Sequence, residues 1–296
     1  MPDQKRALAY GLATVLLWST MATAFKLTLR HVHPAALVFW ASVFSTIALG
    51  ALLAVRGRLI EALAGLRTGW RTALPLGLVN PAIYYLVLFK AYDLLPAQVA
   101  QPVNYTWAIT LSLLAAVFLG HRLTRLDVLA TALAYAGVVI ISLRSQRFSA
   151  ETGISLLGLA LALGSTLLWA GYWIANTKDT RLPVAGLFQN FLLSLPVLAA
   201  AVWAIEGAGA FTPPAAGLLG AAYIGTLEMG LSFALWLAAL KHATHAGSVS
   251  TLIFLSPPIS LVFIHYVLGE TIHPNTYWGL GLILLGLGVQ NWSRMR

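Results

Sequence analysis

Only 9% of the 296 residues are charged, whereas 59% are hydrophobic, and the mean hydropathy is +0.82. A soluble domain carries about 25% charged residues, so this composition excludes a water-soluble fold. The net charge of +9 does not indicate a nucleic-acid-binding protein, because the basic residues fall in short clusters between apolar runs. The absence of cysteine excludes a disulfide scaffold. Lipid is the solvent that accepts such a chain.

Apolar runs that are long enough to cross a bilayer recur along the whole sequence. A membrane-spanning helix needs about 20 predominantly apolar residues. The predicted spans are 7–28, 34–55, 70–91, 97–119, 126–143, 153–175, 183–205, 214–238, 246–268 and 275–293. Proline marks several of the predicted starts, where its missing N–H costs little. The sequence therefore predicts a polytopic all-α membrane protein with ten transmembrane helices.

The distribution of Lys and Arg between the short loops predicts the orientation in the membrane. If the N-terminus is cytoplasmic, 13 of the 18 basic residues fall on the inner side and five on the outer side. Basic loops are retained on the cytoplasmic side, so we expect both termini to be inside the cell.

Two short motifs recur at nearly one offset. Leu16–Trp18 is repeated as Leu167–Trp169, 151 residues later. Leu119–His121 is repeated as Leu268–Glu270, with Glu270 in place of His121, 149 residues later. Chance similarity between apolar segments is the alternative explanation, but ordered matches at one spacing favour an internal repeat.

The repeat predicts two five-helix units. The first covers residues 1–148 and the second covers 149–296, with the join near residues 148–152. Because five is odd, the second unit must enter the membrane from the opposite side. Inverted repeats are typical of secondary transporters, which place the substrate site near the midplane between the repeats. We therefore expect two inverted five-helix repeats around a central cavity.

Duplicated five-span halves, with a Trp near the middle of each first span, resemble the drug/metabolite transporter superfamily in its EamA-type branch. Leu268–Glu270, after Ser256–Pro258, is similar to the ending of that family's fourth helix. Asn104–Trp107 resembles the YddG-type exporters of aromatic amino acids, whereas His121 departs from the acid that the family pattern has. The resemblance implies a ten-helix basket in a bacterial inner membrane that exports aromatic and other neutral amino acids.

Glu228 is the most informative ionisable residue, because it lies near the middle of the predicted span 214–238. A carboxylate at that depth costs about 2.5–3.5 kcal/mol on insertion scales, so it is expected to face protein or a cavity. It is either a substrate-amine anchor or proton-coupling group, or a protonated hydrogen-bonding group between helices.

Aromatic residues mark the first span of each half. Trp18 and Trp169 lie at mid-helix, away from the interfacial belts, and Trp173 follows Trp169 one turn later. They are predicted either to line a cavity that stacks on a planar substrate or to pack between helices.

Polar groups gather on the third and fourth spans. Asn80 and Tyr84 share one helix face, and Pro81 is expected to bend that helix. The fourth span adds Gln101, Asn104, Tyr105 and Trp107. Lipid offers amides no partners, so these groups are predicted to bind substrate or to join helices.

Two features near the C-terminus have simpler alternatives. His265, near the end of the ninth span, is predicted to line the cavity or to lie at the interface. Gly279 with Gly286, and Gly281 with Gly288, repeat every seven residues. Such small residues permit close helix packing, either inside the bundle or in a dimer.

The leading hypothesis is a secondary transporter that exports neutral, especially aromatic, amino acids by alternating access. The alternatives are a transporter of another small metabolite or cationic drug, and an intramembrane enzyme. The enzyme is disfavoured because no HExxH, GxSxG or P-loop motif occurs. No cofactor, metal site or nucleic-acid partner is predicted. The expected partners are an amino-acid substrate and the bilayer, and the protein is expected to be a monomer or a dimer.

Overall fold

A computed structural model describes residues 3–120, 123–142, 155–243, 249 and 251–295. The described residues are predominantly helical and include no strand, which confirms the predicted all-α class. The predicted join near residues 148–152 lies outside the described residues, and so does His121.

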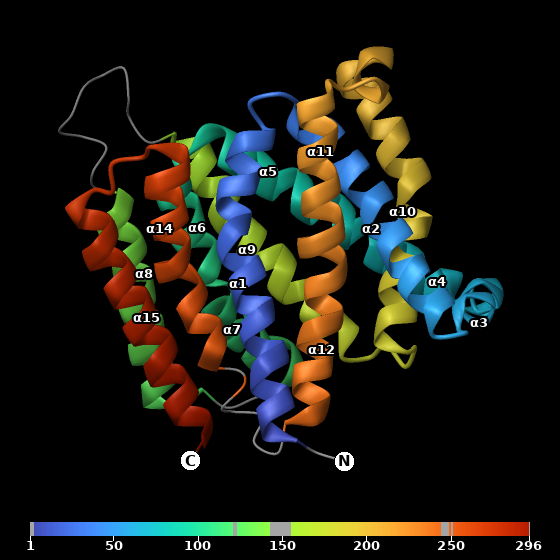
Figure 1. Cartoon of the computed structure of the whole chain (residues 1–296). Helices are drawn as coiled ribbons and strands as arrows, with labels where there is room; N and C mark the ends of the chain where they lie inside the picture. The colour runs from blue at the N-terminus through green and yellow to red at the C-terminus, as the bar shows by residue number, and fades with distance from the viewer. Residues whose placement is uncertain (1–2, 121–122, 143–154, 244–248, 250, 296) are drawn as a thin grey trace.

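Figure 1 shows the helices of the described residues in chain order. The first half of the chain contains α1 (Gln4–Thr28), α2 (Pro34–Val55), α3 (Leu59–Ala64), α4 (Leu66–Gly77), η1 (Leu78–Ile83), α5 (Tyr84–Leu94), α6 (Ala97–Tyr105), α7 (Trp107–Leu119) and α8 (Arg125–Ser142). The second half contains α9 (Leu156–Asn176), α10 (Pro183–Glu206), η3 (Ala208–Phe211), α11 (Ala215–Tyr223), η4 (Ile224–Leu231), α12 (Ser232–His242), η5 (Thr251–Leu255), α14 (Ser256–Leu268) and α15 (Pro274–Met295).

Eight helical stretches among the described residues are long and apolar enough to span a membrane. They are residues 4–28, 34–55, 66–94, 97–119, 125–142, 156–176, 183–206 and 215–242, which agree with the first eight predicted spans. The shorter apolar helix Leu252–Leu268 and the 22-residue α15 occupy the positions of the predicted ninth and tenth spans. The eight stretches confirm a multi-pass helical architecture.

Two of these helices are interrupted at mid-length, by a kink in η1 between α4 and α5 and by a wide π-helical turn in η4 between α11 and α12. In η1, Asn80 has non-helical dihedral angles (φ −135°, ψ 111°) just before Pro81, at the predicted bend. Asn80 and Glu228 lie 148 residues apart, so the two interruptions occupy corresponding positions in the two halves. Wide turns of this kind are frequent at functional sites.

The packing of the helices follows the internal repeat. α1 packs against α12 and α14, and α9 packs in the same way against α5 and α7. α2 pairs with α10, and α8 pairs with α15. Exchange of the two halves maps the contacts of α1 onto those of α9, and it maps the pairs α2–α10 and α8–α15 onto themselves.

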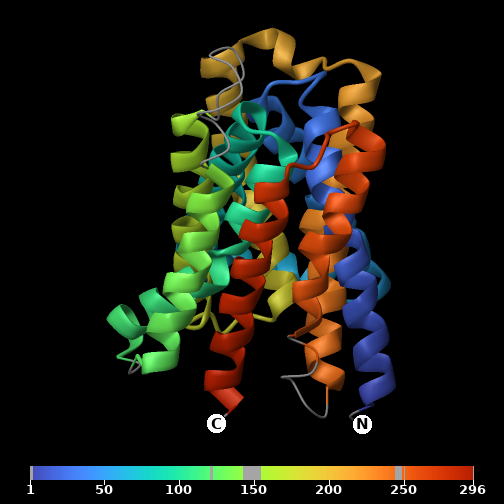
Figure 2. The same ribbon diagram turned by 90° about the vertical axis from the view of Figure 1, so that its left-hand side faces the viewer.

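The two halves run in opposite directions through the bundle. Both chain ends lie at the same end of the bundle, hereafter the terminal end, and the opposite end is the far end (Figures 1 and 2). Tyr10, near the start of α1, and Arg181, just after α9, line one pocket at the terminal end. Since α1 begins where α9 finishes, the first helices of the two halves are antiparallel.

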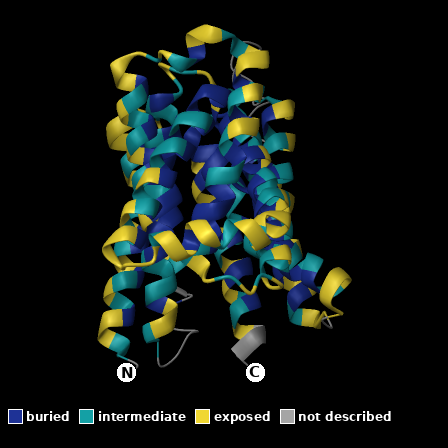
Figure 3. Cartoon of the chain, turned by 90° about the vertical axis from the view of Figure 1, so that its right-hand side faces the viewer, coloured by how far each residue is buried: buried dark blue, intermediate teal, exposed yellow. Residues whose placement is uncertain are grey.

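The outer surface of the bundle is apolar. Leu156, Val117 and Trp278 are 80%, 75% and 73% exposed, and exposed residues cover the outer helix faces (Figure 3). Water would not stabilise so many exposed apolar side chains, whereas lipid does. The polar groups that remain inside therefore require partners in the protein or in a cavity.

The glycines of α15 divide between two environments. A Cβ atom on Gly279 would overlap the carbonyl oxygen of Gly137 in α8, and one on Gly286 would overlap the carbonyl oxygen of Ala130. Gly281 and Gly288 have open space on their side. The first pair thus permits the close approach of α15 to α8, which is the internal packing that the sequence predicted as one of two alternatives.

We expect Gly279→Ala to destabilise the protein by about 1–3 kcal/mol, because the added methyl group overpacks against backbone. The thermal unfolding midpoint of the purified protein in detergent measures this effect. Gly281→Ala, on the open side of the same helix, is the matched control and is expected to leave the midpoint unchanged. Equal midpoints for the two variants would contradict the packing role.

Candidate functional site

A central cavity lies between the two halves, at the level of the two interruptions. Its volume is about 110 Å³. The described residues that line it are Trp18, Met21, Phe25, Tyr84, Tyr85, Leu88, Tyr92, Gln101, Asn104, Tyr105, Trp107, Trp169, Trp173, Glu228, Phe233, Trp236 and Ile253. They come from both halves, as the inverted repeat predicts.

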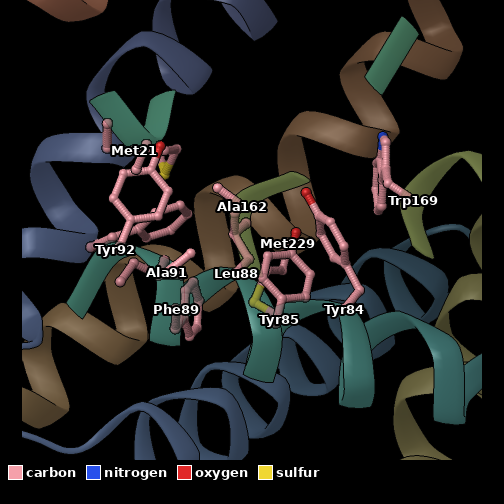
Figure 4. Close-up of a cluster of buried hydrophobic side chains, with 14 of the residues drawn as sticks. Met21, Tyr84, Tyr85, Leu88, Phe89, Ala91, Tyr92, Ala162, Trp169 and Met229 are labelled. Carbon is pink, nitrogen blue, oxygen red and sulfur yellow. The ribbon is translucent and has the colours of Figure 1, made fainter. Parts of the chain in front are cut away.

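Trp169 is the centre of the aromatic wall of this cavity. Its ring stacks on Tyr84, with 4.5 Å between the ring centroids and 28° between the planes, and the two side chains lie together in Figure 4. Trp107 and Trp173 meet it edge-on, at centroid distances of 6.4 and 5.9 Å. Trp169 also stacks on Tyr172 at a centroid distance of 5.8 Å, so this part of the wall is a closely packed aromatic cluster.

Glu228 presents an unsatisfied carboxylate oxygen to the cavity. Oε1 accepts a 3.3 Å hydrogen bond from the Tyr85 hydroxyl, whereas Oε2 is buried and has no hydrogen bond to any described residue. The Ser232 hydroxyl donates to the Glu228 carbonyl, and the Trp18 indole donates to Ser232 Oγ at 3.0 Å. An acceptor that is buried without a partner is costly, so Glu228 favours a ligand that donates a hydrogen bond or a proton.

Two amides add polar groups to the wall. Gln101 Oε1 accepts a 2.6 Å hydrogen bond from the Tyr92 hydroxyl. Asn104 Nδ2 donates to Ser165 Oγ at 3.0 Å, which joins α6 to α9. Each amide keeps hydrogen-bonding capacity beyond these contacts, so both are able to contact a ligand as well as to join helices.

Nine of the eleven residues predicted for the site line the cavity. They are Trp18, Tyr84, Gln101, Asn104, Tyr105, Trp107, Trp169, Trp173 and Glu228. The structure places two elsewhere. Asn80 is completely buried beside the bend in η1, where Tyr172 is a near neighbour. His265 is exposed near the end of α14, with Nδ1 3.0 Å from the Glu270 carbonyl oxygen, as the interfacial alternative predicts.

Several residues of the aromatic wall were not predicted from the sequence, above all Tyr85, Phe233 and Trp236. Tyr85 donates to Glu228, and Trp236 meets Trp18 at a centroid distance of 5.5 Å. The π-helical turn adds a residue and shifts every later position around the helix axis. A regular 3.6-residue period therefore does not predict which residues share the helix face of Glu228. The aromatic residues near position 228 are nevertheless apparent in the sequence.

A side pocket adjoins the cavity toward the terminal end. The cavity and this pocket share Trp173, Phe233 and Trp236 as lining residues. The side pocket in turn shares Arg181 and Pro183, together with Leu237, with a wide vestibule at the terminal end that has a volume of about 690 Å³. The three spaces thus follow one another from the centre of the bundle toward the terminal end, with these shared side chains between them.

At the far end, polar contacts tie the helices together. The Glu270 carboxylate accepts hydrogen bonds from the backbone N–H groups of Ala97 (2.8 Å) and Gln98 (3.2 Å), so it caps the start of α6. Lys26 Nζ donates to the carbonyl oxygens of Tyr92 (2.7 Å) and Leu95 (3.0 Å) at the end of α5. Below these contacts Phe25 packs on Tyr92, with both rings lining the cavity. These contacts fix the far ends of α1, α5 and α6 above the cavity.

We expect Glu270→Ala to lower the stability of the protein by about 1–2 kcal/mol, because the first N–H groups of α6 lose their cap. The thermal unfolding midpoint in detergent tests this. Glu61→Ala is the control, since Glu61 makes only an exposed ion pair with Arg58 and such pairs contribute about 0–1 kcal/mol. A smaller effect for Glu270→Ala than for Glu61→Ala would contradict the capping role.

The fold and the site define a class of protein. A helical bundle with apolar outer faces, and with a carboxylate in a central cavity between its halves, is typical of a multi-pass integral membrane transporter. The sequence profile of the EamA-like transporter family matches residues 5–143 and again residues 156–292. The chain belongs to this family, which confirms the predicted membership, and each half of the chain carries one match.

Three relatives have amino-acid sequences similar to this chain. A "Probable terminal-alkyne amino-acid exporter" of Streptantibioticus cattleyicolor is 28% identical over 60% of this chain. The match spans 59% of that relative's length. An "Uncharacterized transporter" of Archaeoglobus fulgidus is 25% identical over 93% of this chain and 94% of its own. "Uncharacterized transporter YwfM" of Bacillus subtilis is 27% identical over 54% of this chain and 52% of its own length.

One solved crystal structure superposes on 97% of this chain and on 97% of its own, with a TM-score of 0.66 and 22% sequence identity. The likeness covers both halves and shows a common fold.

Proposed function

We propose that this protein exports aromatic and other neutral amino acids by alternating access. In this proposal the chain crosses a bacterial inner membrane ten times, with both termini in the cytoplasm, and acts as a transporter rather than an enzyme. One observation carries the proposal. A cavity walled by Trp and Tyr rings contains Glu228 at mid-depth, with one carboxylate oxygen free of hydrogen bonds among the described residues.

The chemistry of the cavity fits an amino acid with an aromatic side chain. An aromatic ring has Trp169 and Trp107 to stack against, and the ammonium group has Glu228 Oε2 as an acceptor. The amides of Gln101 and Asn104 are available to the polar end of the substrate. The name of the Streptantibioticus relative, an amino-acid exporter, supports the same substrate class.

The arrangement of the halves supports alternating access. Neighbouring pockets lie between the cavity and the terminal end, whereas helix contacts such as that of Lys26 lie between the cavity and the far end, so we assign the structure to a state that loads from the cytoplasm if the termini are cytoplasmic. By rocking around one central site, inverted halves are able to open the cavity to one side of the membrane while they close it to the other. The interruptions η1 and η4 lie beside the cavity, where a change of helix direction would open one side and close the other.

A small cationic amine or drug is a second candidate substrate. Glu228 lies among aromatic rings, and no Lys or Arg occurs among the described residues that line the cavity. Aromatic faces with a nearby carboxylate attract cations. The same absence of basic groups disfavours sugar phosphates, which require Lys or Arg.

Uptake into proteoliposomes of the purified protein tests the proposal. Radiolabelled phenylalanine and tryptophan are expected to accumulate and to compete with each other, and a sugar phosphate is expected to do neither. A cationic dye tests the second candidate in the same vesicles. If neither amino acid is carried or competes, export of neutral amino acids is ruled out.

A further inference from the structure

The side pocket between the cavity and the vestibule contains an ion pair opposite an aromatic surface. Trp173, Phe233 and Trp236, which it shares with the cavity, form one side, and Asp179 with Arg181 form another. The volume of this pocket is about 140 Å³. Both charged residues lie between α9 and α10, outside the membrane-spanning helices.

The ion pair is well ordered and largely shielded from water. The Arg181 guanidinium binds the Asp179 carboxylate with two parallel hydrogen bonds, Nε to Oδ1 at 2.9 Å and Nη2 to Oδ2 at 2.7 Å. The side chains are only 15% and 9% exposed. Burial raises the pKa of Asp179, but the hydrogen bonds and charge of Arg181 outweigh burial and hold this pKa below its ordinary value. Asp179 is therefore ionised at neutral pH, and the pair presents a fixed negative and a fixed positive group.

Two amides of α10 hold the guanidinium from behind. Arg181 Nη1 donates to Gln189 Oε1 and Nη2 donates to Asn190 Oδ1, both at 2.8 Å. Gln189 is itself anchored, because its Nε2 donates to the Ala62 carbonyl oxygen of α3 at 2.6 Å. These contacts use four of the five guanidinium N–H groups, so one N–H on Nη1 is left for a further acceptor.

We propose that this pocket is an access subsite for zwitterionic α-amino acids, which bind antiparallel to the Asp179–Arg181 pair before they reach the central cavity. The ammonium group of the amino acid meets Asp179, its carboxylate meets Arg181, and its side chain lies against the aromatic surface. This inference rests on the proposed function. It assigns the recognition of the carboxylate to the side pocket, because no Lys or Arg is present among the described lining residues of the cavity.

The vestibule favours the arrival of such a ligand. Arg56 and Lys241 line it, and its described carboxylate Glu61 is already paired with Arg58. A basic mouth attracts the carboxylate of an approaching amino acid. The positive groups then continue inward to Arg181, which lines both the vestibule and the side pocket.

Kinetics of the double variant Asp179→Asn/Arg181→Gln test the subsite. It removes both charges, keeps hydrogen-bonding groups of similar size and leaves the net charge unchanged. We expect the KM for phenylalanine uptake to rise about tenfold, as the loss of charge-assisted hydrogen bonds implies, with kcat unchanged. The KM for phenethylamine, which has no carboxylate, is expected to change less than about twofold. Lys90→Gln/Asp93→Asn removes an exposed ion pair elsewhere and is the matched control.

Gln189→Met distinguishes recognition from a structural role. If the pair only fixes α10 to α3, this variant is expected to raise both KM values, and the double variant is expected to do the same. An equal rise for the two ligands, or no rise for phenylalanine, overturns the subsite. If wild-type protein carries no phenylalanine at all, the proposed function fails instead.

A competition experiment on the wild-type protein does not depend on the folding of any variant. Phenylalanine methyl ester keeps the ring and the ammonium group but lacks the carboxylate. We expect it to inhibit phenylalanine uptake with a Ki about tenfold higher than unlabelled phenylalanine. Equal inhibition by the ester and the amino acid would overturn the subsite and leave amino-acid transport standing.

Discussion

Glu228→Gln is expected to lower kcat/KM for phenylalanine transport by about 10- to 100-fold. The substitution keeps the size of the side chain and removes its charge. A hydrogen bond to a charged group contributes about 1.5–3 kcal/mol, and that stabilisation of the ammonium group would be lost. Initial rates of uptake into proteoliposomes measure the effect. If Glu228 also exchanges protons, the dependence of the rate on an imposed pH gradient will disappear in the variant.

Asp93→Asn is the control for this experiment, because Asp93 is an exposed carboxylate that pairs with Lys90 at 2.7 Å, away from the cavity. It is expected to transport at the wild-type rate. Unchanged transport together with unchanged pH dependence in Glu228→Gln would exclude the carboxylate from the mechanism. Glu228 would then be a structural group that forms hydrogen bonds with neighbouring helices.

Trp169→Ala is expected to raise the KM for phenylalanine and tryptophan by about 2- to 10-fold, since a stacked pair of rings contributes about 0.5–1.5 kcal/mol. Trp169 contacts Tyr84, Trp107 and Trp173, so its removal also loosens the rest of the wall. Transport of alanine, which has no ring, is expected to change less. Uptake of the three amino acids in parallel measures the difference.

Two variants make the Trp169 result interpretable. Trp278→Ala removes an indole that is 73% exposed on α15, and it is expected to leave transport unchanged. Trp169→Phe keeps an aromatic face and is expected to restore most of the affinity for phenylalanine. If Trp169→Ala affects alanine and tryptophan equally, Trp169 supports the cavity without contacting the ring of the substrate.

Most of the fold follows from one-dimensional features of the chain. Hydropathy predicts the spans because each must be about as long as the hydrocarbon layer is thick, whatever its neighbours are. Proline predicts starts such as Pro34 and Pro183, which occupy the first turn of α2 and α10. The short α3 was not predicted, because six residues carry no span-length signal.

The composition of the site was also largely predictable, because polar and aromatic residues at mid-span stand out against an apolar background. Glu228 and Trp169 are examples. Asn80 shows the limit of this reasoning. Asn80 is also a polar residue at mid-span, and it corresponds in the internal repeat to Glu228. It is nevertheless buried beside the bend and does not line the cavity.

The sequence by itself determined that this protein is a helical membrane protein with a duplicated pattern, since lipid demands long apolar helices and internal hydrogen bonding. Only the tertiary structure decided which polar groups meet. The pairing of Tyr85 with Glu228, and of Gln189 with Ala62 of α3, joins residues that are distant in sequence. The interruptions at η1 and η4 change the direction of each side chain beyond them, so no regular period along the chain predicts these contacts.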